Sequence, residues 1–143
     1  MARRRQRNDV TPHHVPDGVV LDSGALGAAA TGDPRVRAEL TLAEQLGVAI
    51  HVSSVTLTET LRGHRRDARI HALLAGVVQH SVTPALGRAA GELLGRLDRD
   101  DTVDALVAVN AEVIGRRVRL LTGDPVDLRA LTTGMPNVTV VPV

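Results

Sequence analysis

The chain has 143 residues, enough for one domain with a single packed core, and its 43% hydrophobic and 23% charged residues are ordinary for a globular protein. All 17 basic residues are arginine, and cysteine, phenylalanine, tyrosine and tryptophan are absent. These absences exclude a disulfide framework, a cysteine-ligated zinc ion, a thiol nucleophile and any lysine chemistry. They also argue against single-strand binders that stack bases on aromatic side chains.

No apolar run approaches the roughly 20 residues that span a bilayer, and the basic start MARRRQR is not followed by the apolar segment of a secretory signal. We therefore expect a cytoplasmic protein without a membrane segment. The net charge of +1 does not by itself imply a polyanionic partner, but arginines cluster within residues 3–7 and 62–69. Clustered arginines either bind phosphates bidentately or form a solvated face, and the sequence leaves both interpretations open for residues 62–69.

Residues 1–17 contain the arginine-rich start and two prolines, and they are predicted to form a disordered basic lead-in to a folded domain over residues 18–143. Within that domain, short apolar runs predict strands at residues 18–22, 48–52, 117–122 and 138–141, with a further short strand at 78–82. Apolar residues at helical spacing predict helices at residues 23–30, 35–46, 54–61, 68–77, 84–97, 102–114 and 125–131. This alternation predicts an α/β domain with a mostly parallel sheet and right-handed crossovers.

Four acidic residues are placed near one edge of such a sheet. Two of them directly follow a strand, and the other two lie on helices. Asp22 directly follows the first strand, and Asp124 follows the strand near the C-terminal end of the chain. Asp104 lies in the first turn of a helix that is apolar almost all round, and Glu59 lies on the helix after the second strand. Because ligands bind beyond the carboxyl ends of parallel strands, the four side chains are predicted to meet at one rim.

Three of these acids also have a purely structural interpretation. Asp104 would stabilise its helix by about 0.3–1 kcal/mol through the helix dipole. Asp124 would serve as a turn residue or helix cap, and Glu59 would face solvent and pair with Arg62 or His64. Each explanation is sufficient for one residue, but none accounts for all of them lying at the same rim.

Clustered carboxylates repel one another, so without a cation one or more of them would be protonated at neutral pH. Asp22 is the hardest to explain structurally, because it ends a buried apolar strand and is followed by small residues. Hard oxygen ligands select Mg²⁺ or Mn²⁺, and such ions lower the pKa of bound water and neutralise a phosphodiester transition state. The pattern therefore indicates phosphodiester hydrolysis without a covalent enzyme intermediate.

Four segments in order, VVLDSGAL, VTLTETLRG, DDTVDALVAVNA and LLTGDPVDLRAL, followed by VTVVPV, resemble the PIN-domain family, and within it the VapC-like toxins of type II toxin–antitoxin systems. The resemblance extends from about Val19 to the C-terminus. It implies a PIN-like three-layer α/β/α fold with a mostly parallel central sheet, and a Mg²⁺- or Mn²⁺-dependent endoribonuclease. It also implies a homodimer and a small cognate antitoxin whose tail enters the acidic groove.

The resemblance assigns catalytic or supporting roles to seven residues of this chain. The acidic positions of the metal site match Asp22, Glu59, Asp104 and Asp124, with Asp127 as a more variable fifth acid and Ser23 and Thr122 as supporting hydroxyl residues. Gly24 stands where a serine is common, which removes one side-chain donor near the first aspartate.

The resulting hypothesis is a metal-dependent endoribonuclease in which three carboxylates hold the ion, those of Asp22, Asp104 and Asp124. Glu59 coordinates the same ion or orients the attacking water. Three arginines of the second cluster are expected to hold the RNA backbone, namely Arg62, Arg65 and Arg66. Because the chain has no aromatic side chain, we expect it to recognise structured RNA by shape and phosphate geometry.

Two other classes of function compete with this hypothesis. Phosphoryl transfer to an aspartate, as in receiver domains or haloacid-dehalogenase-like phosphatases, normally needs a lysine, which this chain lacks. A catalytically silent module that binds RNA or a protein on the same fold stays open, because a fold does not fix a function. Cleavage that depends on a divalent metal distinguishes the nuclease from the silent module.

Overall fold

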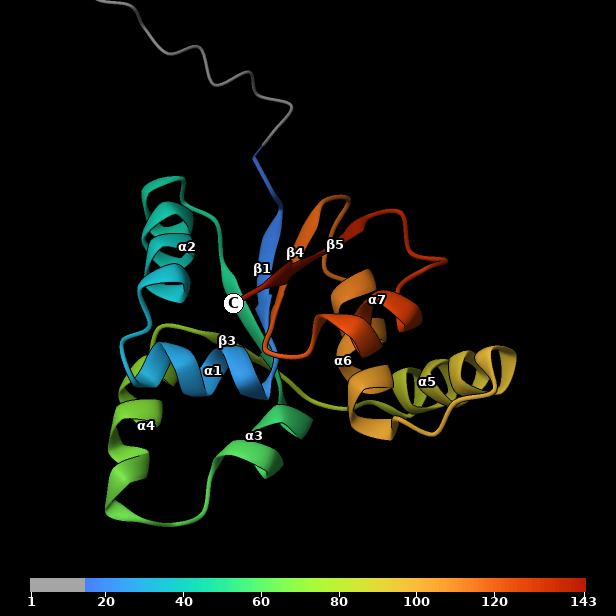
Figure 1. The fold of residues 1–143 in the computed structure, drawn as a ribbon, viewed down its shortest axis with the longest axis horizontal. Coiled ribbons are helices and arrows are strands. Elements are labelled where there is room, and N and C mark those ends of the chain that lie inside the picture. Colours follow the sequence, from blue (N-terminus) through green and yellow to red (C-terminus); the bar gives the residue numbers. More distant parts are fainter. Residues whose placement is uncertain (1–14) are drawn as a thin grey trace, which may run out of the picture.

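A computed structural model describes residues 15–143, which form one sheet covered by helices on both faces (Figure 1). All strand pairs in the sheet are parallel, and the strand order is β3-β2-β1-β4-β5. The strands, in chain order, are β1 (Gly18–Leu21), β2 (Ile50–Ser53), β3 (Val78–His80), β4 (Val118–Thr122) and β5 (Val138–Pro142). The predicted parallel sheet is therefore confirmed, including the short strand near residue 78.

The centre of the sheet is the pairing of β1 with β4, whose register runs from Gly18 opposite Val118 to Leu21 opposite Leu121. Every residue of β1 is buried, because successive side chains of the strand point to opposite faces and both faces are covered. Val20 packs in the core on one face, whereas Val19 and Leu21 pack in the core on the other. This explains why the strand reads as an unbroken apolar run.

Two helical layers enclose the sheet. Core residues from α1 (Ser23–Ala30), α2 (Pro34–Gln45) and α4 (Ala68–Leu74) cover one face. Core residues from α5 (Pro84–Leu97), α6 (Thr102–Glu112) and α7 (Pro125–Leu131) cover the other. The three-layer α/β/α architecture predicted from the sequence is therefore confirmed.

One short helix joins the two layers. Helix α3 (Ser54–Thr60) begins at the carboxyl end of β2 and contacts both α1 and α6. It therefore crosses the edge of the sheet at which the parallel strands end. A 3-10 turn, η2 (Arg65–Asp67), then leads into α4, and this turn was not predicted from the sequence.

Several element boundaries differ from the predicted ones for local reasons. Strand β2 begins at Ile50, two residues later than predicted, because the Val48 amide donates to the carbonyl of Ala43 and closes the end of α2 (2.8 Å). Helix α4 ends at Leu74, three residues earlier than predicted, because the amides of Gly76 and Val77 close tight turns there.

The ordered domain begins before Gly18. The Asp17 amide donates to the Arg117 carbonyl (2.7 Å), and the Asp17 carboxylate accepts from the amides of Arg116 (2.6 Å) and Arg117 (2.9 Å). Asp17, which the sequence analysis placed in the lead-in, thus holds the start of β1 beside the start of β4. Residues 1–14 of the predicted lead-in lie outside the described residues.

Among residues 15–143, no helix combines the length and the apolar character that crossing a membrane requires.

Candidate metal centre and basic cleft

The pairing of β1 with β4 brings the two acids that follow these strands to the same edge of the sheet. Asp22 lies directly after β1, and its amide donates to the Leu121 carbonyl of β4 (3.1 Å). Its side chain is 6% exposed, and its Oδ1 accepts from the Ala25 amide (2.7 Å) as the N-cap of α1. Asp124 follows β4 at the N-cap position of α7, with an exposed side chain that makes no capping hydrogen bond.

Thr122 connects these two acids. It is the last residue of β4 and is fully buried, and its Oγ1 accepts from the Asp124 amide (2.8 Å). Its hydroxyl also hydrogen-bonds the Asp22 carboxylate. The predicted supporting role of Thr122 therefore has a structural basis, because one hydroxyl fixes both the side chain of the first acid and the backbone of the second.

The first turn of α1, which follows Asp22, lies backbone to backbone against the loop after β4. A Cβ atom placed on Gly24 would lie 3.1 Å from both the nitrogen and the Cα of Gly123. A side chain at position 24 would therefore have to push the loop after β4 away. The departure noted in the sequence, a glycine where serine is common, matches this close contact.

Asp104 and Glu59 complete the cluster from the helices. Asp104 is half-buried in the first turn of α6, and its pKa is raised to about 6. Burial is the largest cause, followed by repulsion from four other carboxylates, those of Asp22, Glu59, Asp101 and Asp124. The predicted acids therefore lie near enough for their charges to act on Asp104, but among residues 15–143 the acids whose ligand atoms lie within 4.8 Å of one another are Asp101, Asp104 and Asp127.

Repulsion also acts on Asp22. Burial raises its pKa, and the negative charge of Glu59 raises it further. Hydrogen bonds from the Thr122 hydroxyl and from the amides of Ala25 and Gly123 act in the opposite direction, because they stabilise the charged form. The structure thus holds a buried carboxylate in a fixed orientation.

Glu59 faces solvent, as its structural interpretation expected, but it forms no pair with Arg62 or His64. Within residues 15–143 no ion pair involves Glu59, and the nearby Arg62 guanidinium instead donates to the carbonyls of Thr58 (2.9 Å) and Leu61 (2.8 Å). Glu59 is exposed on α3, and its charge acts on Asp22 and Asp104.

Two residues of the centre were missed by the sequence analysis. Ligand atoms of Asp101, Asp104 and Asp127 lie within 4.8 Å of one another, so these acids form a second part of the cluster. Arg99 bridges two of them, with Nε 2.6 Å from Asp101 Oδ2 and Nη2 2.6 Å from Asp127 Oδ1. Asp101 occupies the N-cap position of α6, yet its side chain makes no capping hydrogen bond. The only available signal was its three-residue spacing from Asp104.

The donor set fits a hard divalent cation. Every candidate ligand is a carboxylate oxygen, and the repulsion that raises the pKa of Asp104 is what a dication would relieve. The chain offers no cysteine, and no histidine belongs to the acidic group. Mg²⁺ and Mn²⁺ match these ligands better than Zn²⁺ does.

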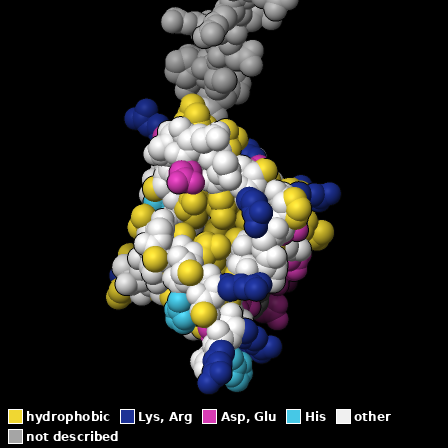
Figure 2. Space-filling view, turned by 90° about the vertical axis from the view of Figure 1, so that its left-hand side faces the viewer, with side chains coloured by type: hydrophobic (Ala, Val, Ile, Leu, Met, Phe, Trp, Pro, Cys, Tyr) yellow, Lys and Arg dark blue, Asp and Glu magenta, His cyan; other side chains and the backbone are white. Residues whose placement is uncertain are grey.

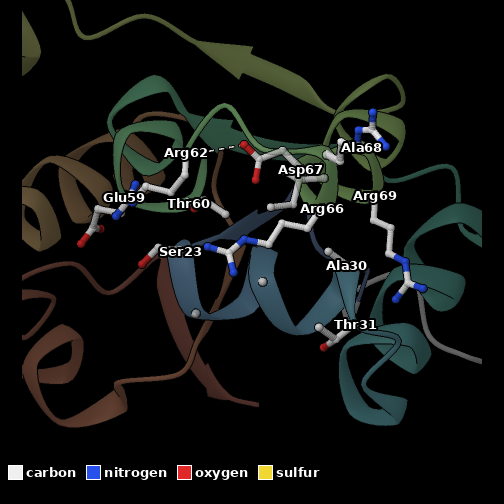
Figure 3. A pocket seen from close by; sticks show the side chains of 14 residues that line it. Ser23, Ala30, Thr31, Glu59, Thr60, Arg62, Arg66, Asp67, Ala68 and Arg69 are labelled. Carbon is white, nitrogen blue, oxygen red and sulfur yellow. Dashed lines mark hydrogen bonds between the residues drawn. The ribbon is translucent and has the colours of Figure 1, made fainter.

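A cleft of about 770 Å³ runs along α1, and Glu59 is the acid of this centre that lines it (Figure 3). Ser23 and Glu59 lie at one end of the view, the Arg66 side chain extends across α1, and Arg69 lies near Thr31 at the other end. The predicted RNA-binding arginines all line this cleft, namely Arg62, Arg65 and Arg66. The structure thus places arginine side chains and part of the acidic centre along one channel.

A single carboxylate organises the arginine-bearing loop. Asp67 is buried, and its Oδ2 accepts from the amides of Arg62 (2.8 Å), Gly63 (2.7 Å) and His64 (3.2 Å). These hydrogen bonds, the one from Arg62 foremost, hold the pKa of Asp67 below its usual range. Because this loop is tied at its base, its arginine side chains start from a fixed backbone.

A second, apolar groove of about 450 Å³ adjoins the helices α2 and α4. It is lined by residues that include Leu40, Val48, Ile50, Leu73 and Val77. Figure 2 shows hydrophobic side chains gathered in a hollow on this face, with arginine and histidine side chains along its lower border. Both the groove and the basic cleft are bounded by α1 and α4.

Comparison with solved structures defines the class of fold. No family model matches the sequence, and no curated protein matches it. The structure, however, superposes on chains of three toxin–antitoxin complexes over most of its length. The fold is therefore the PIN-like three-layer α/β/α fold that the resemblance implied.

The three complexes come from different bacteria. VapBC2 from Rickettsia felis, bound to a DNA fragment from its promoter, gives a TM-score of 0.68 at 16% identity over 87% of this chain and 98% of that one. A toxin–antitoxin complex from Klebsiella pneumoniae gives 0.66 at 18% identity over 85% and 96%. DNA-bound VapBC from Salmonella typhimurium gives 0.63 at 18% identity over 87% and 97%.

The repulsion at Asp104 predicts how the metal-free protein responds to pH. Because its pKa is raised from 3.8 to about 6 by folding, the folded protein binds the proton more tightly than the unfolded chain. The stabilising contribution is therefore complete below the unfolded value and is lost as the pH rises through about 6. In chelator, the melting temperature of the wild type should fall between pH 5 and pH 7.5.

Asp104→Asn should flatten this fall and raise the stability at pH 7.5 by about 1 kcal/mol after allowance for solvent screening, or roughly 3–5 °C. Melting curves followed by circular dichroism across this range provide the measurement. Glu92→Gln, which removes an exposed acid from α5, is the matched control and should leave the slope unchanged. Clear destabilisation of Asp104→Asn at pH 7.5 would argue against a repulsive cluster.

Proposed function

We propose that this chain is a divalent-metal-dependent endoribonuclease and the toxin of a toxin–antitoxin pair. The observation that carries the proposal is the convergence of Asp22, Glu59, Asp104 and Asp124, recorded in the raised pKa of Asp104. Holding mutually repelling carboxylates together lowers the stability of the fold, and a cation bound between them would relieve the repulsion.

Asp22, Asp104 and Asp124 would hold a Mg²⁺ or Mn²⁺ ion. When bound, such an ion supplies Lewis-acid activation of a water molecule and neutralises the charge that develops on a phosphodiester. The Thr122 hydroxyl and the Ala25 amide orient the Asp22 carboxylate for this role. Ser23, the next residue along α1, lines the cleft that leads to the centre.

Glu59 is the residue suited to handle the proton. Its carboxylate is exposed, forms no ion pair with the described residues and lines the cleft, so one of its oxygens can accept the proton of the attacking water. The same carboxylate could instead contribute to holding the ion. In either role Glu59 lies between the acidic centre and the channel by which the substrate would enter.

The arginine-lined cleft supports RNA as the substrate. Guanidinium groups bind phosphates bidentately, and the three predicted residues line the same cleft as Glu59. Since no aromatic side chain is available for stacking, the substrate is structured RNA recognised through its backbone.

The toxin assignment rests on the structural neighbours, which are toxin–antitoxin complexes. An exposed apolar groove of the kind found between α2 and α4 commonly marks contact with another protein. We infer that a small antitoxin covers this face and reaches the acidic groove, and that the toxin itself forms a homodimer.

The first test is RNA cleavage by the purified chain. Incubation with total RNA in Mn²⁺ or Mg²⁺ should produce defined cuts, chelator should abolish them and added metal should restore them. Asp22→Asn should lower the rate at least 100-fold, because it removes a charged ligand and leaves the fold capped. Asp33→Asn, which changes the N-cap of α2, is the matched control. Cleavage that is indifferent to chelator would exclude the proposed metal chemistry.

The second test concerns the arginine cleft. Arg66→Gln should weaken binding of RNA by metal-free protein for all sequences alike and reduce the slope of log K against log salt by roughly 0.7 to 1. Binding is measured by fluorescence anisotropy at several salt concentrations. Arg88→Gln, an exposed arginine on α5, serves as the control. An unchanged slope for Arg66→Gln would remove this residue from the RNA interface.

The third test concerns the toxin assignment. Expression of the chain alone should arrest bacterial growth, and Asp22→Asn should relieve the arrest. Co-expression with the small protein encoded next to it, where one exists, should restore growth and yield a complex that co-purifies. Equal toxicity of wild type and Asp22→Asn would show that the arrest does not come from hydrolysis at this centre.

A further inference from the structure

Beside the proposed metal ligands lies one cation that the proposed mechanism does not use. Arg99 binds two carboxylates at once, through Nε to Asp101 and through Nη2 to Asp127, each at 2.6 Å. The side chains of Arg99 and Asp101 are each 26% exposed and that of Asp127 is 37% exposed, so both contacts are partly shielded from water. The two acids belong to the group of three whose ligand atoms lie within 4.8 Å of one another, and Asp104 is the third member.

The backbone fixes where this arginine can reach. Helix α5 ends at Leu97, and its C-cap residue Asp98 has a φ of 52°, the single positive value for a residue other than glycine among residues 15–143. The Arg99 amide then donates back to the Leu94 carbonyl (3.0 Å). This left-handed turn is tight, and only two residues separate Arg99 from the start of α6 at Thr102. The guanidinium is therefore held against the first turns of α6 and α7.

We propose that Arg99 is a positioning residue that acts as a built-in cation: it occupies one side of the acidic centre and limits the centre to a single divalent ion, held by the acids that follow β1 and β4. This inference rests on the proposed metal-dependent function and names how many ions that function uses.

The chemistry of the guanidinium group supports this role. It is always charged in proteins, has only donors, and forms a planar fork that engages two carboxylates together. Asp101 and Asp127 each have an oxygen committed to this fork. A divalent ion at the same place would need those oxygens and would lie next to a fixed positive charge. Nucleases that use two ions place them about 3.5–4 Å apart, a spacing that requires both sides of an acidic cluster. Here one side is filled by the protein itself.

Counting the bound ions tests the inference. Metal-free full-length protein is titrated with Mn²⁺, and free Mn²⁺ is measured by electron paramagnetic resonance. The wild type should bind one ion per chain, and Arg99→Gln should bind two. Arg96→Gln removes an arginine one turn earlier, which makes no ion pair within residues 15–143, and it should bind one ion like the wild type. Equal numbers for the wild type and Arg99→Gln would overturn the inference, as would two ions in the wild type.

A second variant guards against a folding defect. Arg99→Met removes the charge and keeps an apolar stem, and it should also bind one ion more than the wild type, with the fold checked by circular dichroism. An additional ion in neither variant would overturn the inference. If the wild type binds no Mn²⁺, the proposed function fails. If it binds Mn²⁺ but the Arg99 variants bind the same number, only the role of Arg99 fails.

Discussion

The parallel pairing of β1 with β4 is the constraint on which the site depends. These two strands form the buried centre of the sheet, and a slip of one residue would move their apolar side chains from one core to the other. The register is therefore strongly fixed, and so is the position of whatever follows each strand. Hydrogen bonds of Thr122 and of the Asp22 amide tie the acidic residues to these strands, so the fixed register also fixes the positions of the acids.

Two kinds of carboxylate occur near the carboxyl edge of the sheet. The direction and cause of their pKa shifts distinguish a carboxylate with a structural role from one with a chemical role. Asp67 accepts hydrogen bonds from amide donors that lower its pKa, and its role is to hold its loop closed. Asp104 is surrounded by other carboxylates that raise its pKa, and nothing in its own turn relieves the repulsion. A buried acid satisfied by the backbone is an ordinary part of a fold, whereas one repelled by its neighbours is suited to bind a cation.

The fold and the four principal acids could be predicted from the sequence because each depends on local signals. The unbroken apolar strand, its final aspartate and the regular alternation of helices determine the layers, and parallel topology then brings strand ends together. The roles of Arg99 and Asp101 could not be predicted, because they depend on a left-handed turn at Asp98 and on a contact with Asp127, 28 residues away from Arg99 in the chain. Such contacts produce no periodic pattern in a sequence from which they could be predicted.

The contact between Gly24 and Gly123 bears on which ion the centre would prefer. Neither residue has a side chain to supply a ligand atom, yet their backbones set how closely the first turn of α1 and the loop after β4 approach. Adding a single methyl group would spread these segments by a few tenths of an ångström. The oxygen shells of magnesium and calcium differ in radius by about the same amount. Discrimination between the two ions would thus be sensitive to the smallest residues at the rim, although they have no side chain to bind an ion.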